Sequence, residues 1–117
     1  MRSVRQSRIA DQIRAEISHL LLREIKDPRI GIVTITRVNI TADLKIARVY
    51  FCNMGNMVTD KNAALAGLKS ATGFIKRMLG KNLNLRYIPN IEFFYDDSFE
   101  YQDRIERLIT KTKKEDK

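Results

Sequence analysis

The sequence of 117 residues contains one cysteine, one histidine, two prolines and no tryptophan. A single cysteine, Cys52, excludes a disulfide bond within the chain and any zinc site built from several cysteines. Uninterrupted apolar runs, such as Leu20–Leu22, are far shorter than the ~20 residues that a membrane-spanning helix needs. No apolar segment with a small-residue cleavage site follows the basic N-terminus, so we expect a cytoplasmic protein that does not associate with membranes.

The sequence also gives little support for catalysis. His19 lies within an apolar helical pattern, and no serine or cysteine signature accompanies it as a nucleophile. Cys52 ends an expected strand, where we interpret it as a small core residue rather than a reactive thiol. The glycine patterns of P-loops and of dinucleotide-binding folds are both absent. The residues therefore provide no basis for a cofactor or an enzymatic activity.

Acidic residues near the C-terminal end form the one arrangement that could hold Mg²⁺. The group consists of Asp96, Asp97, Glu100 and Asp103. Acidic side chains at the start of a helix are stabilised by the helix dipole, which explains these residues without a metal. We favour this second interpretation. A small metal-dependent enzyme that uses Asp96, Asp97 and Glu100 is kept as an alternative.

Positive charge is the most informative feature of the composition. Lysine and arginine number 22 against 14 aspartate and glutamate residues, for a formal net charge of +8. Between Lys61 and Arg86 there are six basic residues and no acidic one, whereas charges that serve only solubility normally include both signs. Such a concentrated charge favours a polyanionic partner, because each phosphate that a protein neutralises releases condensed counterions. RNA is therefore the favoured partner.

The candidate RNA contacts fall into two basic groups. Three arginines near the N-terminus are spaced by three residues, so a helix would align them along one edge. Four further basic residues share an expected helix, and a fifth follows it. The candidates are Arg2, Arg5 and Arg8 in the first group, and Lys69, Lys76, Arg77, Lys81 and Arg86 in the second. A solvated helix surface, or a basic module that binds an acidic protein, is the alternative for both groups.

Hydrophobic periodicity predicts a helix followed by two strands. Apolar residues at spacings of three and four predict a long helix over residues 5–26, which Asp27-Pro28 ends. The predicted strands are Ile32–Ile40 and Leu44–Cys52, joined by a turn at Thr41–Asp43. Strict alternation in the first strand would place five residues on one face, namely Ile32, Thr34, Thr36, Val38 and Ile40.

The second half of the chain is predicted to contain an interrupted helix and a third strand. The helical segment runs over residues 59–79, with Thr59 as its N-cap and Gly67 and Gly73 as interruptions. The small residues at 70–73 permit a kink and the close approach of another backbone. The third strand is Ile91–Tyr95, and the connection before it is long enough for a parallel crossover.

The expected architecture is α+β, in the order α-β-β-α-α-β, with helices on one face of a three-stranded sheet. A further helix over residues 100–110 would complete a single monomeric domain at residues 1–110. Residues 111–117 are polar and charged and are expected to form a flexible tail.

Several short motifs, in their order and spacing over residues 5–98, resemble a known family. They are Arg5, Arg8-Ile9, Lys26-Asp27-Pro28-Arg29, Val33-Thr34-Ile35-Thr36-x-Val38, Asp43-Leu44-x-x-Ala47-x-Val49-Tyr50 and Leu85-Arg86-x-x-Pro89-x-Ile91-x-Phe93-x-x-Asp96-x-Ser98. Together they make the chain resemble ribosome-binding factor A, a family of bacterial assembly factors for the small ribosomal subunit.

This resemblance implies a type II KH domain. Ordinary KH domains clamp single-stranded RNA with a GXXG loop, and this sequence has no GXXG. In the family an Ala-x-Gly helix kink replaces that loop, which corresponds here to Ala71 and Gly73. The resemblance also implies a protein without enzymatic activity that associates with free 30S subunits. It would assist late maturation of 16S rRNA and be important for growth in the cold.

Overall fold

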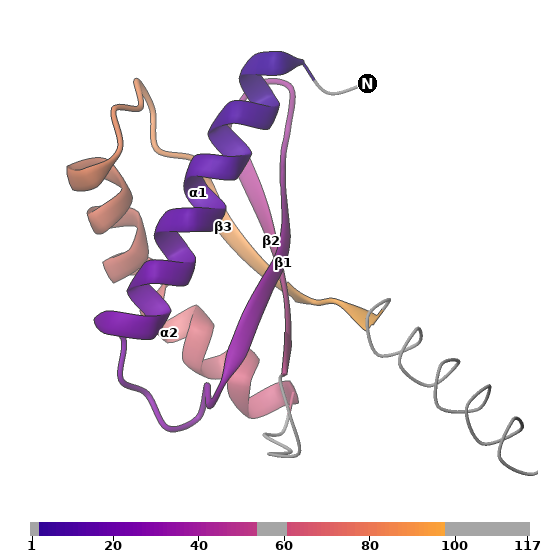
Figure 1. Cartoon of the computed structure of the whole chain (residues 1–117), viewed down its shortest axis with the longest axis vertical. Helices are drawn as coiled ribbons and strands as arrows, with labels where there is room; N and C mark the ends of the chain where they lie inside the picture. Colours follow the sequence, from indigo (N-terminus) through magenta and orange to yellow (C-terminus); the bar gives the residue numbers. More distant parts are fainter. Residues whose placement is uncertain (1–2, 54–60, 98–117) are drawn as a thin grey trace, which may run out of the picture.

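The computed structural model of the chain describes residues 3–53 and 61–97. Its elements are α1 (Val4–Arg23), β1 (Val33–Ile40), β2 (Ile46–Asn53), α2 (Lys61–Asn82) and β3 (Asn90–Tyr95). β1 pairs antiparallel with β2, and β2 pairs parallel with β3, so the strand order is β1-β2-β3. Both helices lie on the same face of this sheet (Figure 1). The predicted α+β architecture with a parallel crossover is confirmed.

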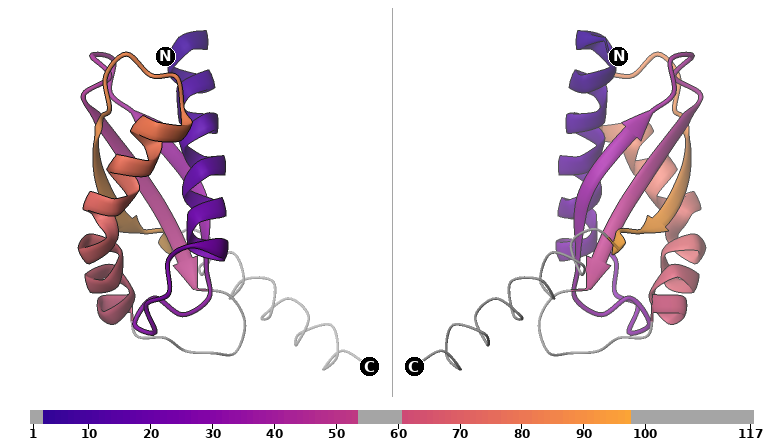
Figure 2. Two further views of the ribbon diagram at one scale, coloured as in Figure 1. Left: turned by 90° about the vertical axis from the view of Figure 1, so that its left-hand side faces the viewer. Right: turned by 90° about the vertical axis from the view of Figure 1, so that its right-hand side faces the viewer.

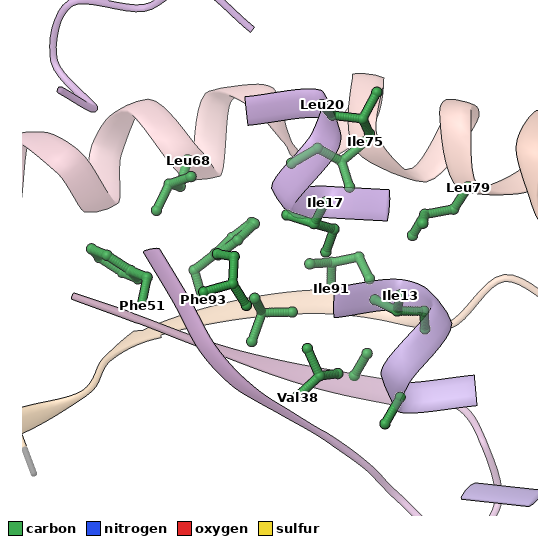
Figure 3. Close-up of a cluster of buried hydrophobic side chains, with 14 of the residues drawn as sticks. Ile13, Ile17, Leu20, Val38, Phe51, Leu68, Ile75, Leu79, Ile91 and Phe93 are labelled. Carbon is green, nitrogen blue, oxygen red and sulfur yellow. The ribbon is translucent and has the colours of Figure 1, made fainter. Parts of the chain in front are cut away.

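The hydrophobic core lies between the two helices and the sheet (Figure 3). α1 contributes Ile13, Ile17 and Leu20 at helical spacing, as its apolar pattern predicts. From β2, three alternate residues are fully buried: Ala47, Val49 and Phe51. Burying an isoleucine or leucine side chain contributes about 1.5–3 kcal/mol to stability, so this single layer of contacts holds the described elements together. Neither described helix is apolar enough over its length to cross a membrane.

β1 departs from the predicted alternation because it contains a β-bulge. Ile35 and Val38 are both buried, whereas Ile32 is 60% exposed, so the predicted face is wrong in its first half. The register with β2 shifts between Ile35 and Arg37, which leaves Thr36 as an extra residue. A bulge reverses the faces that side chains take on either side of it. Arg37 is consequently turned away from the core.

α2 is one helix where the sequence predicts an interrupted pair. The buried residues Leu68, Ile75 and Leu79 lie on both sides of Gly73 and belong to the same core. Their burial outweighs the roughly 1 kcal/mol that a glycine costs within a helix. The helix axis nevertheless bends (Figures 1 and 2). The Thr72 hydroxyl donates a hydrogen bond to the Leu68 carbonyl at 3.1 Å, a contact that often bends helices. The kink at Ala71 and Gly73 itself stays a prediction.

The start of α1 is held against the end of β1. The Ser3 hydroxyl accepts a hydrogen bond from the Gln6 backbone N–H at 3.0 Å, and the Gln6 side chain accepts one from the Ser3 N–H at 2.9 Å. This capping box satisfies two N–H groups that the first turn of a helix leaves free. Gln6 also donates to the Ile40 carbonyl at 3.0 Å. The first turns of α1, which carry Arg5 and Arg8, are therefore attached to the end of β1.

The turn after α1 packs directly against α2. The Asp27 carboxylate accepts hydrogen bonds from the Arg29 backbone N–H at 3.0 Å and from its guanidinium at 2.6 Å. The bond from the Arg29 side chain lowers the pKa of Asp27. A Cβ atom on Gly67 would lie 2.7 Å from Ile30 Cγ1 and 3.3 Å from an Asp27 carboxylate oxygen. The approach of another backbone predicted at residues 70–73 is not seen at Gly73, where a Cβ would meet nothing within 4 Å, and the close contact at Gly67 is with side chains.

Some element ends differ from their predicted positions. α1 ends at Arg23, three residues before the predicted end. β2 begins at Ile46 rather than Leu44, because Leu44 adopts the left-handed conformation with φ of 62°. The predicted N-cap Thr59, the final helix over 100–110 and the tail at 111–117 lie outside the described residues.

Cys52 is part of a buried group at one end of the sheet. Cys52 is 2% exposed, which agrees with its interpretation as a small core residue. Asp96 is also buried and accepts a hydrogen bond from the Thr36 hydroxyl at 2.5 Å. Burial, and secondarily the charge of Asp96, raises the pKa of the Cys52 thiol. The folded protein therefore holds this group as a neutral thiol.

The Gly67 contact can be tested with two glycine substitutions in the same helix. Gly67→Ala should destabilise the protein by about 1–2 kcal/mol, because the added methyl group meets the buried Ile30. Gly73→Ala should instead stabilise it by about 0.4–1 kcal/mol, because space is open there and alanine favours the helix. The free energies of unfolding in urea measure both effects. Changes of the same sign would contradict the assignment of the close approach to Gly67.

The neutral thiol can be tested by its reactivity with a disulfide reagent. At pH 8 the folded protein should react far more slowly than the chain unfolded in urea, and its reaction should begin at higher pH. The unfolded thiol loses its proton first, so stability should fall as the pH rises past the ordinary thiol pKa. Comparable rates for folded and unfolded chains would show that Cys52 is accessible.

Candidate nucleic-acid interface

Seven of the eight predicted RNA contacts lie within the described residues, and Arg2 lies outside them. All seven are at or near the surface on the helical side of the molecule or in the loop that follows α2. They are Arg5 and Arg8 of α1, Lys69, Lys76, Arg77 and Lys81 of α2, and Arg86. We call these seven residues the helical basic surface.

Four basic residues share the side of α2 that faces away from the core. Lys69, Arg77 and Lys81 are exposed. Lys76 is half-buried and donates a hydrogen bond to the Asn90 side chain at the start of β3, at 2.9 Å. Within residues 3–53 and 61–97, none of the four forms an ion pair with a carboxylate. The four residues therefore lie along one side of α2 without a carboxylate partner in the described part of the chain, and their contact with RNA stays a prediction.

Gly73 lies between two of these charges. Lys69, Gly73 and Arg77 are each four residues apart, a spacing that places them in one row along a helix. Open space surrounds the position that a Cβ on Gly73 would occupy. An anion can therefore approach the backbone of α2 closely at this point, with a cation on either side.

Part of each basic group lies toward one end of the molecule. The beginning of α1 and the end of α2 lie at the same end of the helical layer (Figure 2). The Asn82 side chain donates a hydrogen bond to the Glu16 carboxylate at 2.8 Å, so the end of α2 lies beside the second half of α1. Arg5 precedes Glu16 by about three helical turns, so it projects from the same side of α1. Lys81 and Arg86 flank Asn82 in the chain and complete this end of the surface.

Tyr87 is a further candidate that the analysis of charge missed. Tyr87 is 72% exposed, and the Arg86 guanidinium lies 5.5 Å from the centre of the Tyr87 ring. An aromatic ring beside an arginine can stack on a nucleobase. The neighbouring pair Arg86-Tyr87 is the sequence signal that could have identified it.

The acidic residues do not form a metal site in the part of the chain that the structure describes. Asp96 is buried against Thr36, and Asp97 is exposed and lies 3.4 Å from the Lys61 ammonium group. Glu100 and Asp103 lie outside the described residues. No group of three or more histidine, cysteine, aspartate or glutamate side chains suited to a metal occurs within residues 3–53 and 61–97. Asp96 instead stabilises the end of the sheet.

Comparison with known proteins assigns the sequence to a family. The model of the family Ribosome-binding factor A matches residues 5–109. The chain is 51% identical over 106 residues to the ribosome-binding factor A of Syntrophobacter fumaroxidans, and the match covers 90% of this chain and 91% of that relative.

Solved structures have the same fold. The crystal structure of ribosome-binding factor A from Thermus thermophilus matches with a TM-score of 0.67 at 20% identity, over 77% of this chain and 94% of that chain. A homology model of the Thermus thermophilus factor, fitted into the cryo-electron microscopy map of a 30S complex, matches with a TM-score of 0.61 at 20% identity. That match covers 75% of this chain and 91% of the fitted chain. The predicted KH-like fold is confirmed.

Proposed function

The chain belongs to the ribosome-binding factor A family, and from this premise we propose that it is an assembly factor that binds free 30S subunits through 16S rRNA. It assists the late maturation of that RNA and is important for growth in the cold. It acts as a cytoplasmic monomer, without enzymatic activity or a cofactor. The family assignment and the 30S complex of a structural neighbour support the ribosomal partner.

The helical basic surface is the observation that carries this proposal. Its charges come from two helices and one loop, and the described part of the chain offers none of its four α2 side chains a carboxylate partner. Lysine and arginine contacts to phosphate add affinity and orient a protein without reading base sequence. A broad surface of this kind suits the closely spaced phosphates of a folded RNA.

The continuity of α2 determines how RNA can bind there. A GXXG loop clamps nucleotides with the backbone groups of an open loop. In α2 the backbone N–H groups around Ala71 and Gly73 lie in the middle of a helix, where they bond to carbonyls of the preceding turn. Binding therefore uses side chains, with the open space at Gly73 admitting a phosphate between Lys69 and Arg77.

The salt dependence of binding tests this interface. Replacing Lys69, Arg77 and Lys81 with glutamine should make the slope of log K against log salt shallower by about 2–3, because each phosphate contact contributes about 0.7–0.9. Lys76 is left unchanged because it also holds Asn90. The measurement is a titration of labelled protein with purified 30S subunits at several salt concentrations.

A variant with the same loss of charge provides the control. Arg14, Arg23 and Lys26 are exposed elsewhere on or after α1, so their replacement with glutamine should leave the slope nearly unchanged. Equal slopes for the two variants would place the interface elsewhere. In cell extracts the protein should sediment with free 30S subunits. Sedimentation with polysomes, or binding that survives digestion of the RNA, would contradict the proposal and favour a protein partner.

A further inference from the structure

The face of the sheet opposite α1 and α2 carries a row of side chains that the helical basic surface does not include. Both helices lie behind the sheet when this face is viewed (Figure 2, right). The strand registers pair Arg37 with Tyr50 and Tyr50 with Phe94. One residue from each of the three strands therefore lies in a single line across this open face.

Tyr50 contacts both of the other side chains. The rings of Tyr50 and Phe94 are stacked, with centroids 5.5 Å apart and an angle of 29° between their planes. The guanidinium carbon of Arg37 lies 4.0 Å from the centre of the Tyr50 ring. Phe94 is 39% exposed although it is a large apolar residue. The row is thus a stack in which the Arg37 cation covers the Tyr50 ring, and Phe94 is the ring that stays exposed.

The β-bulge in β1 produces this arrangement. With strict alternation Arg37 would follow Ile35 onto the core face, and the extra residue Thr36 places it on the open face instead. Thr36 is held in turn by its hydrogen bond to the buried Asp96. Bulges commonly redirect a side chain at functional sites.

Charge on the open face favours an anionic partner. Arg48 is exposed, lies two residues from Tyr50 on β2 and so shares its face. Within residues 3–53 and 61–97, neither Arg37 nor Arg48 forms an ion pair. Arg48 is paired with Glu92 of β3. This pair and the row of Arg37, Tyr50 and Phe94 together carry two arginines and one carboxylate.

We propose that Arg37, Arg48, Tyr50 and Phe94 form an open-face platform that binds an unpaired RNA nucleotide. Its base stacks on the exposed ring of Phe94, which Tyr50 supports from within the row, and the phosphates on either side contact Arg37 and Arg48. A paired base cannot bind in this way, because its faces are covered by its neighbours in the duplex. The choice of RNA rests on the proposed function. The platform and the helical basic surface lie on opposite sides of the fold and can be tested separately.

The absence of tryptophan from the chain allows a direct test. Phe94→Trp introduces one indole on the platform while retaining an aromatic ring for stacking. An oligouridylate of about eight nucleotides, within the range that single-strand-binding folds cover, should quench its fluorescence. A blunt RNA duplex with the same number of phosphates should not. Leu22→Trp, on the exposed side of α1, is the matched control and should keep its fluorescence with both probes.

Affinity measurements complete the experiment. Phe94→Leu keeps an apolar side chain but removes the flat ring, so it should weaken binding of labelled oligouridylate about five- to tenfold. Arg37→Gln should weaken it as well. In the Phe94→Trp background, the glutamine substitutions at Lys69, Arg77 and Lys81 should leave the quenching in place. This result would separate the platform from the helical basic surface. Evidence against one of the two binding sites would therefore not contradict the other.

Three outcomes would overturn the platform proposal. The first is oligouridylate that binds without quenching the indole of Phe94→Trp. The second is equal quenching by the duplex, which would show that stacking on an unpaired base is not involved. The third is a Phe94→Leu protein that binds oligouridylate with full affinity but no longer binds ribosomal proteins stripped of RNA. The open face would then recognise protein rather than RNA.

Discussion

Burial of one face of a three-stranded sheet beneath two helices is the constraint on which the rest of this structure depends. With the central strand contributing Ala47, Val49 and Phe51 to one side, α1 and α2 must share that side to exclude water. Two helices on a narrow sheet are forced together, and Gly67 lets α2 approach the turn after α1. The outer surfaces of the helices and the opposite face of the sheet are then left for binding.

These two remaining surfaces differ in their chemistry because helices and sheets present side chains differently. A helix projects long lysine and arginine side chains over a wide arc, which suits phosphates at many positions on a folded RNA. A sheet lines up side chains from neighbouring strands about 4.8 Å apart, so Arg37, Tyr50 and Phe94 form one continuous row. The exposed Phe94 ring of this row suits the flat face of a base.

The departure from the GXXG type of KH domain follows from the same packing. Leu68 and Ile75 bury both halves of α2 in one core, so the segment between them remains helical despite its small residues. The helix keeps its backbone hydrogen bonds and offers side chains and the open space at Gly73 for contact. Asp96, which the sequence alone could assign to a metal, is used within the fold to hold Thr36 and the bulge.

Local patterns in the sequence determined the order of elements, the core stripe of α1, the alternation of β2 and the basic residues of α2. Each depends on spacing within one segment, which the chain displays directly. Tertiary structure alone decided the bulge at Thr36 and the close contact at Gly67, because both depend on segments that meet only after folding. It also decided how the helices lie together, because the bond between Glu16 and Asn82 joins the second half of α1 to the end of α2. The register of the three strands, which the sequence of one strand cannot show, places Tyr50 between Arg37 and Phe94.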